Sequence, residues 1–480
     1  MKNKPFLVSF LLTAMFAHNV SANDEIRSTL DDQQEVAVTI YNEQLALVKD
    51  SRTIKLGNGF NRLAFREVSA QMRPETALLR SINHPKGFRL IEQNFDFDLL
   101  TPQKLLEKYV GKNVRIVKTH PTTGEERIEE ATVLSVNNGV VLRVGNRIET
   151  GYPGRIIYDK VPENLRDRPT LVISLESGTS KQQDLQLSYL TGGLGWKADY
   201  VAELDESDSY VDLTGWVTLT NQSGATYRNA KLQLVAGDVN QVKQDMQRVR
   251  RSDVMMESMA AKSTPAMVEE GLFEYHLYTL QRPTTISNNQ TKQVSLLSAT
   301  KIPVNKEFLL QGQNHYYRGS YGQIGKKLKV GVFVDFENKE ASNLGMPLPK
   351  GIVRVYKNDK SGNAQFIGED RIDHTPKNEK IKLKLGDAFD VTADKKQTNF
   401  KKSTSIGKYK YAHTSGFEIV LKNAKEEAVE VVVREPIPGD WKMISESHEH
   451  EKVAAGTAEW KINVPAEGKT TLNYEVLVRY

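Results

Sequence analysis

The stretch Phe417-Glu418-Ile419-Val420-Leu421-Lys422 carries an apolar side chain at every second position. A period of two is typical of a β-strand with one buried face. The same period recurs later at Val429, Val431 and Val433, and again at Trp460, Ile462 and Val464. Pro436-Ile437-Pro438-Gly439-Asp440 interrupts the pattern as a strand breaker. Strands joined by loops, with no helices between them, predict an antiparallel β-sandwich over 340–480.

The two-residue period extends to most of the remaining chain. We therefore predict a mostly β fold, with several antiparallel sandwich or barrel domains, one short helix and a mobile central loop. Within the first domain, Gly57-Asn58-Gly59 lies between two strand patterns and predicts a hairpin turn. The expected divisions are a signal peptide at 1–22, an N-terminal β domain at 33–100, a short helix with a small β-barrel insertion at 101–168, a central β domain at 169–339 and the C-terminal sandwich at 340–480.

The predicted helix lies between the first domain and the insertion. Thr101 is suited to the N-cap, Pro102 to the first helical position and Gly111 to the C-terminal end. After Gly111, short strand patterns separated by tight turns continue to about residue 168. Their spacing predicts a small barrel of about 55 residues.

The first 22 residues have the three parts of a secretion signal. Lys2 and Lys4 precede an uncharged apolar run at 6–17, and Val20-Ser21-Ala22 offers small residues for cleavage. We expect cleavage after Ala22 and a soluble protein in the periplasm, whereas an uncleaved anchor would need a longer apolar run. The chain contains no cysteine, which excludes disulfides and a lipid-modified N-terminal cysteine.

The charge of the chain is close to balanced. Its 65 Lys and Arg side chains stand against 60 Asp and Glu, a formal net charge of +5, and two of the cations lie in the predicted signal. A nucleic-acid-binding protein would be strongly basic. We therefore expect no nucleic-acid partner, and we expect no transmembrane segment in the mature chain.

Between 241 and 271 neither the strand period nor the helix period holds, which predicts a mobile surface loop. Methionine adapts to varied apolar surfaces and arginine pairs with acidic groups, so this loop is the first candidate contact. A plain disordered loop is the alternative. The candidate interaction residues are Arg248, Arg250, Arg251, Met255, Met256 and Met259.

His448 and His450 form the only close pair of histidines. Alternate residues of a strand share a face, so both imidazoles would reach one zinc ion if this segment were extended. The sequence does not indicate a third ligand, and a solvated loop is the alternative. No zinc-protease motif, nucleophile elbow or phosphate loop is present, so we predict no catalytic residue, no cofactor and no metal.

The segment Tyr189-Leu190-Thr191-Gly192-Gly193-Leu194-Gly195-Trp196-Lys197-Ala198-Asp199-Tyr200 is distinctive, as are 216–224 and 434–441. Through them the chain resembles bacterial exported proteins that carry the domain of unknown function shared with mucoidy-inhibitor-type proteins. The resemblance implies a mostly β envelope protein and no established activity. Many relatives have a long coiled coil where this chain has 111–168. The motif residues that we expect to be structural are Gly192, Gly193, Trp196, Tyr200, Trp216, Pro436 and Trp441.

Together these features favour a non-catalytic binding or scaffold protein of the cell envelope. It would recognise a protein or an envelope polymer through sheet edges and loops. A hydrolase acting on an envelope polymer, with carboxylates in a cleft, is one alternative. An outer-membrane-associated β protein is another, since apolar residues alternate up to a final aromatic residue at Leu472, Tyr474, Val476, Val478 and Tyr480.

Overall fold

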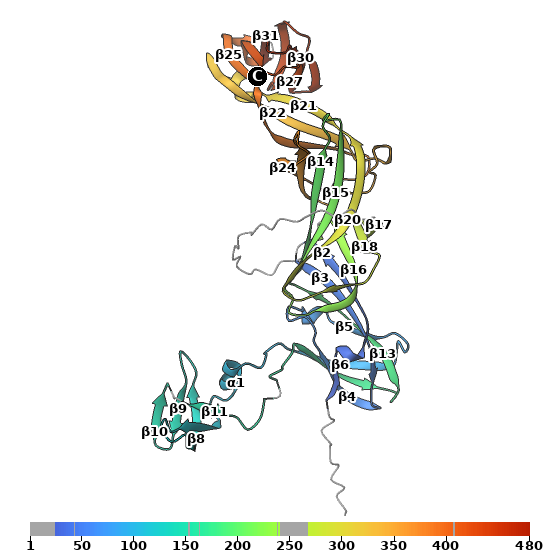
Figure 1. The fold of residues 1–480 in the computed structure, drawn as a ribbon, viewed down its shortest axis with the longest axis vertical. Coiled ribbons are helices and arrows are strands. Elements are labelled where there is room, and N and C mark those ends of the chain that lie inside the picture. The colour runs from blue at the N-terminus through green and yellow to red at the C-terminus, as the bar shows by residue number, and fades with distance from the viewer. Residues whose placement is uncertain are drawn as a thin grey trace, which may run out of the picture.

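The computed structural model describes residues 25–42, 44–151, 154–162, 164–237, 239–240, 267–406 and 409–480. Most of the described residues lie in strands and one segment forms an α-helix, which confirms the mostly β fold with one short helix. The larger sheets follow one another along an elongated body, and one small sheet stands at its side (Figure 1). The predicted signal peptide and the candidate contacts at 248–259 lie outside the described residues.

Two sheets form the end of the body nearest the N-terminus. The four-stranded sheet has the order β1 (Ile26–Ser28), β4 (Gly59–Arg66), β12 (Thr170–Ser177) and β6 (Phe88–Asp96). The eight-stranded sheet has the order β17 (Met267–Leu272), β18 (Tyr275–Leu280), β16 (Tyr227–Ala236), β2 (Gln33–Tyr41), β3 (Leu45–Lys55), β13 (Gln182–Thr191) and β5 (Leu78–Ser81), with β19 (Thr284–Ile286) also paired to β16.

The middle and the far end of the body are formed by two further sheets. The middle sheet has the order β20 (Gln290–Pro303), β15 (Tyr210–Asn221), β14 (Leu194–Leu204), β23 (Gly351–Asn358) and β24 (Ala364–Ile372). The C-terminal sheet has the order β28 (Asp440–Glu446), β31 (Lys469–Arg479), β26 (Tyr409–Asn423), β25 (Lys380–Ile406), β22 (Gln323–Glu337), β21 (Asn305–Gln311), β27 (Val429–Pro436), β30 (Thr457–Val464) and β29 (Glu451–Ala454).

The small sheet beside the body follows helix α1 (Pro102–Lys108), whose predicted N-cap is confirmed because the Thr101 side chain accepts a hydrogen bond from Lys104 N. The strand order is β10 (Arg147–Thr150), β9 (Val141–Val144), β8 (Glu126–Ser135), β7 (Asn113–Thr119) and β11 (Arg155–Ile157). The predicted barrel is therefore wrong: β10 and β11 lie at opposite ends of an open sheet. Each of these short strands pairs with a single described neighbour, β9 or β7, so the sheet does not close.

Four short 3-10 helices complete the described elements: η1 (Leu30–Asp32), η2 (Pro74–Thr76), η3 (Asn314–Tyr317) and η4 (Glu340–Ser342). No helix in the described part of the chain is long and apolar enough to span a membrane.

Three separate apolar cores are found in the part of the chain that the structure describes. The largest runs through the four-stranded, eight-stranded and middle sheets, the second lies in the C-terminal sheet, and the third belongs to the small sheet. Strand β25 reaches two of them: Leu383 lies in the largest core and Val391 in the second. The expected division at residue 340 therefore does not coincide with the sheets, because β21 and β22 belong to the C-terminal sheet while β23 and β24 belong to the middle one.

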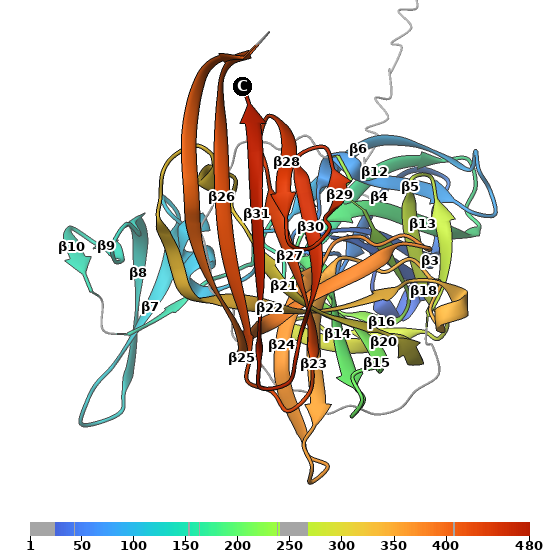
Figure 2. The same cartoon turned by 90° about the horizontal axis from the view of Figure 1, so that it is seen from above.

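The C-terminal sheet folds back on itself around its core (Figure 2). Trp460 of β30 packs against Tyr474 of β31, with ring centroids 4.8 Å apart, although five strands separate β30 from β31 in the sheet order. The strand patterns found in the sequence at 417–421, 429–433 and 460–464 all lie in strands, and the chain breaks between β27 and β28 where Pro436 to Asp440 predicted it. This region has the two facing layers expected of a sandwich.

The predicted hairpin at Gly57-Asn58-Gly59 is wrong. Strand β3 before it pairs with β2 and β13, whereas β4 after it pairs with β1 and β12. The Asn61 side chain explains the corner, since it accepts a hydrogen bond from Gly57 N at 2.7 Å and donates one to Gly59 O at 2.8 Å. These bonds turn the chain from one sheet into another instead of back along the same one.

The predicted loop at 241–271 is also partly wrong. Its last residues, from Met267, form β17, which pairs with β18. Met267 itself is buried in the largest core, so tertiary packing stabilises a strand where the sequence shows no clear period.

Candidate functional site: a projecting module and its anchor

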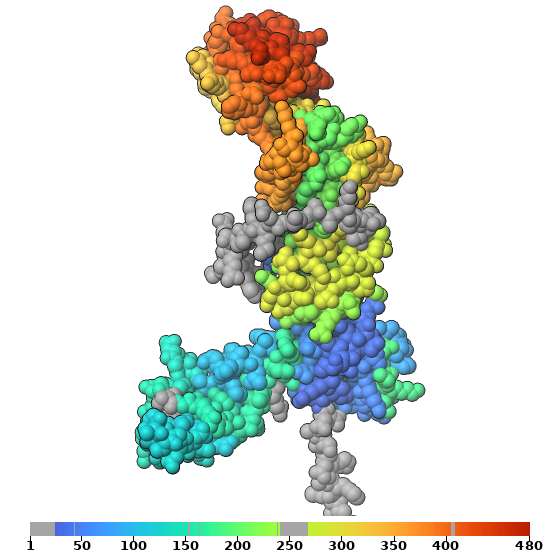
Figure 3. Space-filling view, in the orientation of Figure 1, coloured from blue at the N-terminus to red at the C-terminus, as the bar shows by residue number. Residues whose placement is uncertain are grey.

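Residues 101–159, here called the module, consist of helix α1 and the small sheet. The module has its own core, which includes Ile116, Val133 and Leu142, all fully buried. It projects sideways from the elongated body (Figure 3). Two exposed isoleucines, Ile128 and Ile148, lie on its sheet, and their exposed fractions are 56% and 66%. A separately packed unit with free strand edges and exposed apolar residues is suited to recognition.

The two chain segments that join the module to the body are bonded to each other. Leu100 N donates to Arg166 O at 2.7 Å, and Arg166 N donates to Asp98 O at 3.0 Å. The module therefore leaves and re-enters the body at one place, next to the end of β6.

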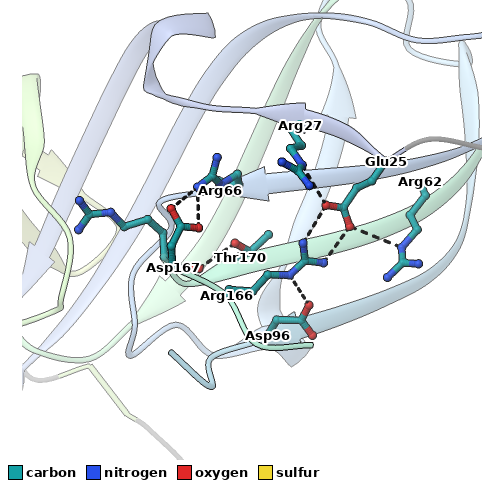
Figure 4. A network of polar contacts seen from close by, with 9 residues as sticks. Glu25, Arg27, Arg62, Arg66, Asp96, Arg166, Asp167 and Thr170 are labelled. Carbon is teal, nitrogen blue, oxygen red and sulfur yellow. Dashed lines mark hydrogen bonds and ion pairs between the residues drawn. The ribbon is translucent and has the colours of Figure 1, made fainter. Parts of the chain in front are cut away.

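A polar cluster at this place, here called the anchor, is built around Arg166 (Figure 4). The guanidinium binds both carboxylate oxygens of Glu25 at 2.8 Å and contacts Asp96 Oδ2 at 2.9 Å. Arg62 and Arg27 lie 3.7 Å from the same Glu25 carboxylate. The paired guanidinium holds the pKa of Glu25 below its usual value, and the two carboxylates raise the pKa of Arg166. This bidentate geometry fixes direction as well as distance, so the anchor sets how the module leaves the body.

The glycine-rich motif lies elsewhere, at the corner between β13 and β14. Gly193 has φ +74°, and its carbonyl accepts a hydrogen bond from Gln222 N at 2.6 Å. A Cβ atom on Gly193 would lie 2.8 Å from Ser223 N, so only glycine fits there. Its neighbour Gly192 packs against the Gln71 side chain. These contacts indicate that the two glycines are structural: they allow the tight corner between β13 and β14.

Two aromatic residues of the motif, Trp196 and Tyr200, face the core. Trp196 is 7% exposed and Tyr200 is fully buried, with its hydroxyl donating to Pro349 O at 2.8 Å. Trp216 lies half-buried on the neighbouring strand β15. A ligand cannot stack on the sealed rings of Trp196 and Tyr200, so they stabilise the body.

A family comparison matches this part of the chain. Residues 185–480 fit the model described as Domain of unknown function (DUF4139), which is more than half of the sequence. The chain belongs to this family. No curated protein matches it. The module and the anchor lie outside the DUF4139 match, whereas the glycine-rich corner and the C-terminal sheet lie within it.

Two family-motif residues and the histidine pair lie in the C-terminal part of the DUF4139 match. Pro436 ends β27, and the Trp441 indole donates to Ala455 O at 2.9 Å. His450 Nδ1 lies 2.9 Å from Glu446 Oε2, whereas His448 Nδ1 lies 2.9 Å from Ser447 Oγ. The two histidines therefore have separate partners. No group of three or more His, Cys, Asp or Glu positioned for a metal ion occurs among the described residues.

The DUF4139 region also contains a buried polar network, here called the sealed network, that the sequence reasoning missed. Lys395 Nζ lies 2.5 Å from Glu435 Oε1, and the Tyr317 hydroxyl donates to Glu435 Oε2 at 2.8 Å. Tyr474 adds a hydroxyl 2.9 Å from that of Tyr317. The exposed fractions of the Lys395 and Glu435 side chains are 2% and 0%. Burial lowers the pKa of Lys395, while the neighbouring carboxylate acts in the opposite direction.

The alternation of apolar side chains along β27 could have revealed part of this network from the sequence. Val429, Val431 and Val433 face the core, and Glu435 continues their register. A glutamate on the core-facing side of a strand is unexpected. Because buried charges are paired, it predicts a buried cation as its partner. Chemically the network is closed, because a Cβ on Gly312 would lie 2.2 Å from Glu435 Oε2. It can hold the fold, but a substrate has no room beside it.

Proposed function

We propose that this chain is a non-catalytic binding or scaffold protein of the bacterial cell envelope. It is exported, starts at Asn23 after cleavage and works in the periplasm, as the signal pattern and the resemblance to mucoidy-inhibitor-type exported proteins suggest. Its partner is an envelope protein or polymer, and a protein strand added to the free edge of the module is the form of recognition that the geometry supports best.

The free edge of β10 carries this proposal. Gly145 and Asn146 form a two-residue turn between β9 and β10, so Val144 and Arg147 face each other next to it. In such a hairpin the pair closing the turn exchanges hydrogen bonds and the next pair does not. The backbone N–H groups of Ile148 and Thr150 therefore point away from β9, toward the open edge. An extended segment of a partner protein would pair there.

The position of the module supports the same conclusion. An edge within the stacked body would admit a partner from few directions, whereas the module projects beyond it (Figure 3). The anchor holds it in one direction, which lowers the entropy lost when a partner binds.

Crosslinking of the tagged full chain in intact cells, followed by mass spectrometry, tests the proposal. We expect an envelope protein crosslinked to residues of the module. Ile148→Pro removes the N–H that faces the open edge without removing a bond to β9, so it should abolish this crosslink. Ile148→Thr keeps the N–H and a β-branched side chain, so it is the matched control and should keep the crosslink.

Equal crosslinking by both variants would show that the edge of β10 is not the contact. Crosslinks that map only to the body, or no partner at all, would contradict recognition by the module.

The structure does not add support for the hydrolase alternative. A hydrolase of this kind would pair carboxyl groups, one of them with a raised pKa. Every carboxyl group in the described part of the chain with a clearly shifted pKa has it lowered, by cations or by hydrogen-bond donors.

A further inference from the structure

The end of the C-terminal sheet carries a cluster of aromatic and cationic side chains, here called the ledge. It consists of Phe400, Lys402, Tyr411, His413 and Tyr480, with Arg318 beside them. The ledge lies at the end where the β25–β26 hairpin and the final residues of the chain meet (Figure 2).

Strand pairing places these side chains on one face. Lys402 of β25 and Val478 of β31 both pair with His413 of β26. Tyr480 N donates to Tyr411 O at 3.0 Å, which extends the ladder by one step. Paired residues of neighbouring strands point to the same side of a sheet. Further along β26 this face is the core side, because Phe417 lies on it in the same alternation and is buried.

The rings form a connected set. The centroids of Tyr411 and Tyr480 are 5.0 Å apart and their planes meet at 27°, while His413 lies 5.3 Å from Tyr411 and 5.2 Å from Phe400. His413 Nδ1 lies 3.2 Å from Tyr317 O, which fixes the orientation of its ring. Tyr411 remains 37% exposed. The core face thus opens into a rigid aromatic surface that water reaches.

Positive charge surrounds the rings. Lys402 Nζ lies 5.8 Å from the Tyr411 ring centroid, and the positive charge of Arg318 acts on the Tyr480 hydroxyl, where it opposes the rise in pKa that burial causes. Lys401 and Lys410 are also exposed on these strands, but alternation directs them to the opposite face of the sheet. Two acidic side chains on the neighbouring strands β28 and β31 have partners outside the ledge: Asp440 contacts Tyr409 and Arg479, and Glu475 contacts Asn399. The ledge therefore favours an anionic ligand.

We propose that the ledge binds an acidic polysaccharide. The flat C–H faces of sugar rings stack on exposed aromatic rings, and the acidic groups of the polymer pair with Lys402 and Arg318. An apolar peptide would not use the cations, and a simple inorganic anion would not use the rings. This site is separate from the edge of β10, so either proposal can fail without the other.

Isothermal titration of the full mature chain with hexagalacturonate, at low and high salt, tests this proposal. The fully methyl-esterified hexasaccharide has the same rings without charge and should bind at least about tenfold more weakly at low salt. Raising the salt should weaken the binding of the charged sugar and leave that of the ester unchanged.

Two variants and one control locate the site. Tyr411→Ala should weaken binding about fivefold through the lost stacking surface, and Lys402→Gln should weaken it and reduce its salt dependence. Lys452→Gln is the matched control, because Lys452 Nζ also lies over an aromatic ring, that of Trp441 at 4.7 Å, while Lys452 belongs to β29, which contributes no residue to the ledge. It should bind as the unsubstituted chain does. Thermal melting checks that each variant is folded.

Any of three results would overturn the proposal: no binding of hexagalacturonate, equal binding of the ester at low salt, or equal loss of binding in Lys452→Gln and Tyr411→Ala. The second would mean a neutral-sugar site, and the third a diffuse attraction to the whole domain.

Discussion

The anchor and the sealed network are both built around an ion pair, but water reaches only one of them. Arg166 and Glu25 retain 13% and 16% of their side-chain surface, whereas Lys395 and Glu435 retain 2% and 0%. The anchor holds a projecting module, while the sealed network lies inside the core that it shares with Phe417 and Trp460.

Because their hydration differs, the two ion pairs should affect stability in different ways. A buried pair gains little over apolar residues of similar volume, but removing one partner leaves an uncompensated charge in a dry core. A partly hydrated pair costs less to break and is screened by salt. We therefore expect the sealed network to control whether the C-terminal sheet folds, and the anchor to control only where the module points.

The largest effect should come from breaking the sealed network. Glu435→Ala leaves Lys395 without a partner and should lower the free energy of unfolding by about 3–5 kcal/mol. The double variant Lys395→Met with Glu435→Leu should recover most of that loss, because no charge remains buried. Urea denaturation followed by tryptophan fluorescence measures both. A double variant as unstable as Glu435→Ala would show that the charges themselves stabilise the sheet.

Alkaline pH should act on the same network. Burial keeps the pKa of Tyr317 and of Tyr474 well above 10, so the folded chain retains protons that the unfolded chain loses. Stability should therefore fall above pH 10, by about 1.4 kcal/mol per pH unit for each such tyrosine. Lys395 acts oppositely only up to about pH 10.5, since its pKa is lowered in the folded state. Tyr474→Phe should reduce the loss of unfolding free energy per pH unit above pH 10 by about 1.4 kcal/mol, the share of one tyrosine. An unchanged dependence on pH would contradict this assignment.

Breaking the anchor should have a smaller effect. Glu25→Gln removes the bidentate partner of Arg166 and should cost about 1 kcal/mol of local stability, with the other three sheets of the body unaffected. Hydrogen exchange should accelerate at the backbone N–H groups of Leu100 and Arg166, because these two groups bond the chain segments that join the module to the body. Arg89→Gln is the control, because its ion pair with Glu176 is largely exposed and lies on the same sheet. Equal exchange in both variants would mean that the anchor does not fix the module.

The smallest effect concerns acid. The pKa of Glu25 lies below 4.5 in the folded chain, so its contribution is present above pH 4.5 and is lost as the pH falls through the folded value. Exchange at Leu100 should rise relative to buried strands below pH 4.5, and 0.5 M salt should reduce the difference. An anchor that loosens first at alkaline pH would contradict the role of Glu25.

The sequence predicted the strands better than their partners. Alternation located β26, β27 and β30, and capping located α1, because both signals are local. The pairing of β3 and β4 with different sheets depends on the Asn61 side chain and on strands more than a hundred residues away, which no local pattern contains. The open edge of β10 was missed for the same reason, since closure of a barrel is a property of all its strands.

The candidate sites were likewise predictable only where the signal is local. Gly192 and Gly193 were expected to be structural, and the contacts described above give that expectation a physical reason. Lys395 and Glu435 were visible as polar residues on core-facing positions, but their pairing required the parallel register of β21 with β27 and the fold of η3 beside them. The ledge draws on β25, β26, β31 and Arg318, so nothing in one segment could reveal it.

We infer that the open edge of the module binds the partner, whereas the sealed network only stabilises the fold. Capture of the crosslinked partner by two folded variants at equal concentration tests it most directly. We expect full capture by Lys395→Met/Glu435→Leu and loss of capture by Ile148→Pro. Loss of capture by the core variant, with full capture by Ile148→Pro, would contradict it.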